Sequence, residues 1–160
     1  MPIRPHQVRH NHDVCVADAV AAAEARVEEA AAKLTPLRRR VLELICASHV
    51  PVGAYQLMDQ LGGARKGRAA PPTVYRALDF LMEHGLIHRI NSLNAYIACF
   101  GPHRPHDACL LICEKCRTVD EVEAEGLRRA IDRKASDAGF SVRGQTIEAT
   151  GLCRACRERA

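Results

Sequence analysis

Apolar positions in the first half of the chain recur at the three- and four-residue spacing of helices. Residues 18–33 are rich in alanine and glutamate, which favour helix, so they predict a first helix. Thr35 can cap a second helix, and Pro36 suits its first position because a proline there gives up no needed N–H. Residues 54–61 predict a short third helix, and residues 62–68 predict a flexible basic loop. The apolar stripe of the second helix consists of Leu37, Val41, Leu44 and Ile45.

A fourth helix is predicted from Pro71 to a stop at Gly85, because glycine readily takes the left-handed conformation that ends helices. Its first turns leave Thr73, Tyr75 and Arg76 exposed. A short helix, a turn and a helix with exposed polar side chains at its start are typical of a helix-turn-helix DNA reader. A plain helical bundle with an amphipathic last helix is the alternative. The predicted buried face of this helix consists of Val74, Ala77, Leu78, Leu81 and Met82.

The pattern changes from helical to strand-like after this fourth helix. The runs LIHRI and AYIAC are separated by residues 91–94, whose composition is that of a turn. A hairpin directly after a recognition helix is a wing, so the first half is predicted to be a winged helix-turn-helix domain. If the hairpin loop covers residues 92–95, His88 lies directly opposite Cys99 on the same face of the ribbon.

Residues 101–107 contain two prolines and a glycine and predict a linker. Beyond it, CLLIC and TVDEVE predict strands, residues 124–139 a helix and residues 140–151 a last strand. The predicted fold class is α+β, an N-terminal winged helix followed by a small α/β domain. The predicted boundaries are a flexible tail over 1–13, the winged-helix domain over 14–100, the linker over 101–107 and the second domain over 108–160.

Composition narrows the class of protein. Apolar residues make up 48% of the 160 residues but aromatic residues only 4%, so the cores are thin, and a metal often stabilises such cores. No apolar run is long enough to span a membrane, and the N-terminus lacks the apolar segment of a secretory signal. We therefore expect a cytoplasmic protein whose eight cysteines are metal ligands and free thiols.

Positive charge is concentrated in the first half. Residues 33–76 hold eight basic and two acidic side chains, a net +6, whereas residues 107–160 hold ten of each. A basic first half beside a neutral second half favours binding of the first half to a polyanion such as DNA. A solvated basic surface is the alternative.

Cys113-x-x-Cys116 and Cys153-x-x-Cys156 are candidate metal ligands. Each pair makes a tight turn that directs two thiolates to one point, and two such turns complete a tetrahedral zinc site. The 36 intervening residues require a strand–helix–strand unit to bring the pairs together. A site closed by four sulfurs leaves no open coordination position, so a structural zinc is predicted. Two redox-active dithiols are the alternative.

A second set of possible ligands surrounds the linker. His88 and Cys99 share a face of the predicted hairpin, and His106 and Glu121 could complete a four-coordinate site. His103 is an alternative to His106. Taken singly, these residues also fit a half-exposed histidine, a buried apolar cysteine and a solvated glutamate.

Four segments in combination resemble the ferric uptake regulator superfamily, and within it the zinc uptake regulator branch. They are LTPLRRRVLELI, PPTVYRALDFLMEHGLIHRINSLNAYIAC, CEKC and GLCRAC, and together they span residues 34–156. The resemblance implies a dimeric metal-dependent repressor with an N-terminal winged helix and a C-terminal dimerisation domain. It also implies a structural zinc on Cys113, Cys116, Cys153 and Cys156, and a regulatory zinc on His88, Cys99, His106 and Glu121.

The resemblance implies that Tyr75 and Arg76 contact the bases and phosphates of DNA, and we expect Thr73, Arg38 and Arg39 to contribute. The expected function is a zinc-responsive repressor of zinc uptake and homeostasis genes, with zinc as corepressor and two Zn²⁺ per protomer. The expected partners are double-stranded DNA with a palindromic operator and a second copy of the chain, without a membrane or a small organic substrate. The regulatory zinc is expected to join wing, linker and second domain, which fixes the DNA-binding domains at the spacing of two half-sites.

Other functions fit parts of the sequence. A repressor of the same superfamily that senses iron or manganese is one alternative, although a thiolate ligand at Cys99 favours zinc. Residues 103–107 also hold fewer histidines than the iron-sensing branch has there. A zinc-storage protein is another alternative. An enzyme is not expected, because H-x-E paired with P-C-x-x-C, a nucleophile elbow and a phosphate loop do not occur. Cys15, Cys46 and Cys109 have no assigned role.

Overall fold

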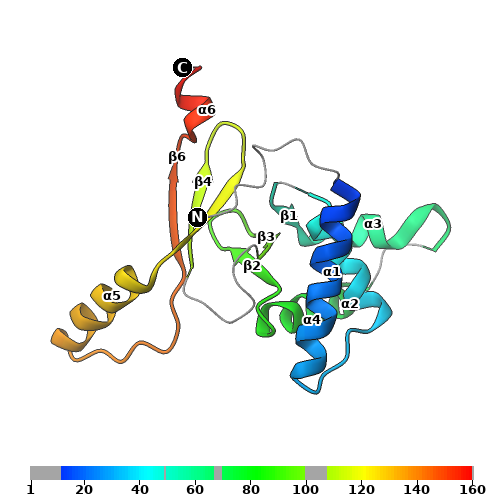
Figure 1. The fold of residues 1–160 in the computed structure, drawn as a ribbon, viewed down its shortest axis with the longest axis horizontal. Helices are drawn as coiled ribbons and strands as arrows, with labels where there is room; N and C mark the ends of the chain where they lie inside the picture. The colour runs from blue at the N-terminus through cyan, green and yellow to red at the C-terminus, as the bar shows by residue number, and fades with distance from the viewer. Residues whose placement is uncertain (1–11, 49, 67–69, 100–107, 160) are drawn as a thin grey trace.

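The computed structural model describes residues 12–48, 50–66, 70–99 and 108–159. The helices of the first half gather on one side of Figure 1, and two sheets stand beside them. This architecture confirms the predicted α+β class with a winged helix in the first half. The elements in chain order are α1 (His12–Glu29), α2 (Pro36–Cys46), β1 (Val52–Gly53), α3 (Ala54–Lys66), α4 (Pro71–Glu83), β2 (Ile87–Ile90), β3 (Ala95–Ala98), β4 (Ala108–Cys113), β5 (Val119–Glu123), α5 (Glu125–Asp137), β6 (Ile147–Gly151) and α6 (Arg154–Arg157).

Helices α2 and α4 begin at the predicted local signals, whereas α1 spans His12–Glu29 rather than the predicted residues 18–33. The Thr35 hydroxyl accepts the backbone N–H of Arg38 at 3.4 Å, and α4 begins at Pro71. Gly85, with φ of 61°, follows α4 in the left-handed conformation. Among the described residues, no helix combines the length and apolar character that a membrane span requires. The apolar faces of α1 to α4 meet in one core, which includes Val27, Val41, Ile45, Leu57, Val74, Leu78 and Leu81.

The predicted tail and the predicted basic loop also differ from the structure. Residues 1–11 of the predicted tail lie outside the described part, and residues 12 and 13 belong to α1. Helix α3 continues through Gly62 to Lys66, so the predicted loop over 62–68 is wrong for its first five residues. A glycine costs about 1 kcal/mol in a helix, but no proline breaks the backbone hydrogen bonds here and the following residues are good helix formers.

The wing hairpin has a different register from the predicted one. Strand β2 pairs with β3 so that His88 lies opposite Ile97, because the turn begins one residue earlier than predicted. The Asn94 N–H donates to the Asn91 carbonyl at 3.2 Å, and Asn94 adopts the left-handed conformation that asparagine tolerates. Cys99 is therefore a diagonal neighbour of His88, and the prediction that they are directly opposed is wrong. Diagonal neighbours still share a face of the sheet.

The second sheet has the order β5-β4-β6, with β5 antiparallel and β6 parallel to the central strand. The crossover helix α5 buries no residue and projects away from both sheets in Figure 1. The predicted last strand over 140–151 is wrong in its first part, because only Ile147–Gly151 pairs with β4. The preceding residues form the path back from the far end of α5 to the sheet. Helix α6 was not predicted.

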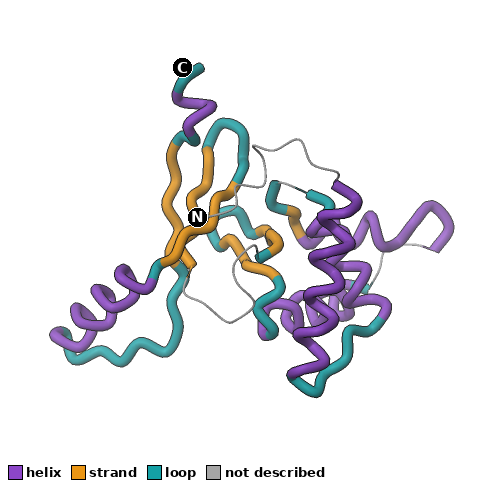
Figure 2. The backbone as a smooth tube through the Cα atoms, viewed as in Figure 1, coloured by secondary structure: helices purple, strands orange, loops and turns teal. Residues whose placement is uncertain are grey.

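A small apolar core joins the two sheets, whose strands lie side by side in Figure 2. Ile90 and Ile97 come from the first sheet, and Leu93 of the wing turn packs against them. The second sheet contributes Leu110, Ile112 and Val119. Apolar burial therefore contributes to the contact between the two halves of the chain.

Candidate metal centres and nucleic-acid interface

The two cysteine pairs meet at one end of the second sheet. Cys113 ends β4 and Cys116 follows in the next turn, whereas Cys153 caps α6 and Cys156 lies within it. The parallel pairing of β4 with β6 sets Cys113 opposite Gly151, which brings the C-terminal pair beside the first pair. The four Sγ atoms lie within 4.8 Å of one another.

The sulfur spacing of this cluster fits a tetrahedral zinc. Sulfurs at about 2.3 Å from such a zinc lie about 3.8 Å apart, and the Sγ atoms of Cys116 and Cys153 are 3.7 Å apart. The backbone N–H of Cys153 donates to Cys113 Sγ at 3.4 Å, which favours the thiolate form. The donor set can therefore hold a zinc ion, and the role of these cysteines as ligands stays a prediction.

The thiols of this cluster differ in acidity. Backbone N–H groups of Cys116 and Cys153 lower the pKa of Cys113 to about 6. Hydrogen bonds from Thr118 lower the pKa of the Cys116 thiol. Burial, with hydrogen bonds to the other thiols, raises the pKa of Cys156 to about 12. Cys113 therefore ionises readily, and its negative charge disfavours ionisation of Cys156. A bound dication would offset this repulsion between thiolates.

A second cluster draws its members from both sheets. His88 lies on β2 and Cys99 directly follows β3, whereas Glu121 lies on β5. Their ligand atoms lie within 4.8 Å of one another. The structure thus brings together three of the four residues predicted to bind the regulatory metal. His106 and its alternative His103 lie outside the described residues, so the fourth ligand stays a prediction.

The geometry of this second cluster also suits a metal. Nε2 of His88 is 3.3 Å from Oε1 of Glu121, and Sγ of Cys99 is 4.0 Å from the same oxygen. Nitrogen and oxygen ligands at about 2.0 Å from a tetrahedral zinc lie about 3.3 Å apart. Burial alone would lower the pKa of His88, but Cys99 and Glu121 raise it to about 10. Two acidic groups at a shielded position therefore attract positive charge, as a proton or as a metal ion.

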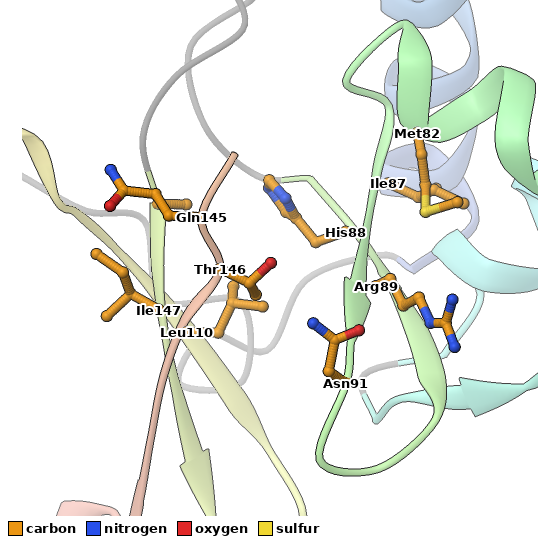
Figure 3. A pocket seen from close by; sticks show the side chains of 10 residues that line it. Met82, Ile87, His88, Arg89, Asn91, Leu110, Gln145, Thr146 and Ile147 are labelled. Carbon is orange, nitrogen blue, oxygen red and sulfur yellow. The ribbon is translucent and has the colours of Figure 1, made fainter. Parts of the chain in front are cut away.

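A cavity of about 460 Å³ lies beside the second cluster, between the two sheets. Figure 3 shows the His88 side chain extending into the space between them. The histidine is therefore accessible from this cavity. The residues lining the first-sheet side include Met82, Ile87, Arg89 and Asn91, and those on the second-sheet side include Leu110, Gln145, Thr146 and Ile147.

The start of α4 carries the predicted DNA-reading residues on its exposed side. Thr73, Tyr75 and Arg76 are all exposed, while the next face of the helix enters the core. The predicted exposure of these side chains is confirmed. Their contact with DNA stays a prediction.

An exposed aromatic residue on α3 was not predicted to belong to this surface. Tyr55, at the second position of α3, is 69% exposed. Helices α3 and α4 share the same core, with Leu57 and Leu78 fully buried. Helical periodicity places Tyr55 only on the polar side of α3. No signal in the sequence marks it for this surface, because singly exposed apolar side chains are normal on protein surfaces.

Two arginines predicted to bind DNA make contacts within the fold. The Arg38 guanidinium lies 3.5 Å from the centre of the Phe80 ring, a cation–π contact. Arg39 forms ion pairs with Glu24 and Glu43. Binding of these side chains to phosphate would have to compete with these contacts.

The chain is similar to known proteins over most of its length. Residues 29–150 match the model of the Ferric uptake regulator family. The Zinc uptake regulation protein of Escherichia coli (strain K12) is 43% identical over 127 residues, which cover 79% of this chain and 74% of that protein.

Two regulators of known structure resemble the chain. A zinc uptake regulator complexed with zinc and DNA has a TM-score of 0.83 and 40% identity, covering 90% of this chain and 96% of that chain. Holo XcZur has a TM-score of 0.80 and 40% identity, covering 88% of this chain and 98% of that one. Apo XcZur has a TM-score of only 0.54 at 39% identity, covering 90% and 99%. The chain is therefore more similar in structure to the holo form of that protein than to its apo form.

Proposed function

The chain belongs to the ferric uptake regulator family, and we propose that it is a zinc-responsive, DNA-binding transcriptional repressor that controls zinc uptake and homeostasis genes. The observation that carries the proposal is the cluster of His88, Cys99 and Glu121, because it joins possible zinc ligands from both sheets at one point. The likeness to a zinc uptake regulator complexed with zinc and DNA supports it. The proposed function is regulatory and not enzymatic.

Two zinc ions per protomer fit the two clusters. A structural zinc on Cys113, Cys116, Cys153 and Cys156 would hold the end of β4 to the C-terminal helix. A regulatory zinc would take His88, Cys99 and Glu121, with His106 as the fourth ligand. When bound there, zinc supplies a dication that neutralises the thiolate and the carboxylate.

The regulatory cluster would act on the orientation of the DNA-binding domain. His88 and Cys99 belong to the wing, which follows α4 directly, so they move with the recognition helix. Glu121 moves with the second sheet. We assign residues 14–100 to the DNA-binding domain, 101–107 to the hinge and 108–160 to the dimerisation domain. The chain has a higher TM-score with holo XcZur than with apo XcZur, which supports a metal-linked change between two domain arrangements.

The DNA-binding surface would centre on the start of α4. Arg76 and Tyr75 are placed for contacts with base edges and phosphates, and Thr73 for a phosphate contact. The excess of basic residues in the first half adds an attraction that weakens with salt. A repressor acting on DNA in this way would work in the cytoplasm.

A homodimer accounts for the exposed apolar residues of the second half. Helix α5 buries none of its residues in a single chain, although its pattern is amphipathic. A second copy could cover this surface, and the two-fold axis of such a dimer would match a palindromic operator. The apolar residues concerned are Leu111, Leu127, Ile131, Phe140 and Leu152.

Two alternatives make different use of the same clusters. A regulator of iron or manganese would favour oxygen and nitrogen ligands, whereas Cys99 brings a soft thiolate to the second cluster. A zinc-storage protein would have no need of an exposed Arg76 and Tyr75 on a recognition helix.

Operator selection with a defined metal tests the proposal. Zinc-loaded protein is used to select duplexes from a random-sequence pool, and the selected DNA is titrated in a gel shift with zinc, iron(II) or manganese(II). We expect tight binding to a palindrome with zinc and weak binding after chelation. If no DNA sequence were selected, the proposal of a repressor would be contradicted. If manganese(II) or iron(II) supported operator binding as tightly as zinc, the assignment of zinc as the sensed metal would be contradicted.

A further inference from the structure

A glutamate of the second sheet accepts hydrogen bonds from the turn of the wing hairpin. The Glu148 carboxylate accepts the backbone N–H of Asn91 at 2.6 Å through Oε1 and that of Ser92 at 3.1 Å through Oε2. Both donors belong to the turn between β2 and β3, whereas Glu148 lies on β6. This bidentate contact therefore joins the two halves of the chain.

The chemistry of this contact suits a carboxylate. Two successive N–H groups form a concave anion site, and the charge on the acceptor strengthens each hydrogen bond. Burial by itself would raise the pKa of Glu148, but hydrogen bonds from the Ser92 side chain and both backbone N–H groups outweigh it and lower that pKa. Glu148 therefore meets the turn as an anion at neutral pH.

The contact lies in the same row of the sheet as the second metal cluster. Leu110 of β4 has Glu121 as its partner on β5 and Glu148 as its partner on β6. Cross-strand partners share a face of the sheet, and neighbouring strands are about 4.8 Å apart. The two glutamates, which lie two strands apart, therefore contact the wing at points roughly 10 Å from each other. Leu110 between them is buried against Ile90 and Ile97 of the wing.

Two separated anchors restrict motion more than one does. A contact at Glu121 restrains the first sheet at one point, and the apolar core between the sheets adds burial without a directional bond. A second directional contact across the row restrains rotation about the first. The wing follows α4 directly, so the orientation of the wing sets that of the recognition helix.

We propose that Glu148 is a positioning residue that docks the wing turn on the second sheet and fixes the rotation of the DNA-binding domain about the His88–Cys99–Glu121 cluster. The contact needs no metal, so zinc at the cluster would complete a docking whose other point is supplied by the chain itself. The consequence for operator binding rests on the proposed function, whereas the docking does not.

The test compares Glu148→Gln and Glu148→Ala with Glu123→Gln in the zinc-loaded full chain. Glu123 is an exposed residue at the end of β5. The two Gln variants remove one negative charge each, so their electrostatic effects on DNA attraction are matched. Amide NMR reports directly on the Asn91 and Ser92 N–H groups, and the remaining amide signals verify the fold.

For Glu148→Gln we expect hydrogen exchange at the Asn91 and Ser92 amides to be roughly tenfold faster or more. We expect operator affinity to fall roughly 5- to 30-fold, with unchanged zinc content, and Glu148→Ala to lose at least as much. Glu123→Gln should match the wild type in all three measurements. Unchanged exchange at both amides in Glu148→Ala would overturn the docking. Faster exchange with unchanged operator affinity would overturn the positioning role. If the wild type bound no operator, the repressor proposal would fail while amide exchange would still decide the docking.

Discussion

Glu121 and Glu148 lie in one row of the second sheet, on either side of Leu110, and both carboxylates face the wing. Glu121 Oε1 lies 3.3 Å from Nε2 of His88, within the cluster of possible zinc ligands. Glu148 meets backbone N–H groups, which are present whether or not metal is bound. The row therefore holds two separate contacts with the same hairpin, one within the candidate metal cluster and one to backbone N–H groups.

Replacement of Cys99 should separate metal sensing from folding. In Cys99→Ser the cluster loses its soft ligand. The factor by which zinc increases operator affinity should therefore be about tenfold smaller than in the wild type. Gel shifts in zinc-buffered solutions measure this. Cys46→Ser, at a half-buried thiol of α2, serves as the control and should keep full zinc dependence. Retention of full zinc dependence in Cys99→Ser would show that this thiol is not a regulatory ligand.

A chelator should remove zinc from one cluster before the other. The four-thiolate site should resist a mild chelator longer than the cluster that spans the two sheets, so native mass spectrometry should show a species with one zinc per protomer. Cys156→Ala should eliminate the resistant zinc and lower the free energy of unfolding by about 4 kcal/mol or more. Thermal unfolding against Cys46→Ala measures this loss. Simultaneous loss of both ions would contradict two sites of different strength.

Arg76 and Arg38 should differ in what their loss affects. Arg76 is exposed on α4, so Arg76→Ala should weaken operator binding by about 1–3 kcal/mol and leave the unfolding temperature unchanged. Arg38 rests on the Phe80 ring, so Arg38→Ala should lower the free energy of unfolding by about 0.5–1 kcal/mol and affect DNA binding less. Gel shifts and thermal unfolding of both variants decide this, and equal losses of DNA affinity would contradict base reading by α4.

Helix α5 should carry the dimer interface. Ile131→Glu places a charge among its exposed apolar residues and should convert the dimer to a monomer, as measured by light scattering. Ser136→Glu adds the same charge at another exposed position of α5 and should remain dimeric. A dimer in both variants would place the interface elsewhere.

Docking of the wing turn should weaken in acid. The pKa of Glu148 is lowered in the folded chain, so its stabilising contribution is complete above the unfolded value of about 4.3 and is lost as the pH falls through the lower folded value. The Asn91 and Ser92 amide shifts should therefore titrate with a midpoint below about 4.3. Zinc ligands also protonate in acid, so Glu148→Gln is measured at each pH and should lack this transition. A midpoint above that value would contradict a carboxylate held by the turn.

Short-range interactions allowed much of this protein to be predicted. The Thr35 cap, Pro36 and the stop at Gly85 act within a few residues, so their consequences can be read along the chain. The spacing of Cys113 and Cys116 likewise places two thiols on one turn whatever surrounds them. These local signals were sufficient for the start of α2, for α4 and for the two cysteine pairs, but not for the wing register or for helix α6.

Tertiary structure decided the register and the partners. Two asparagines and a serine offered competing turns in the sequence, whereas the observed pairing of β2 with β3 places the turn at residues 91–94 and makes Cys99 a diagonal neighbour of His88. Glu148 is separated from Asn91 by 57 positions, and its partners are backbone N–H groups. Every residue except proline carries such a group, so no residue type marks these donors in the sequence. Only the pairing of β6 with β4 brings that carboxylate to the turn.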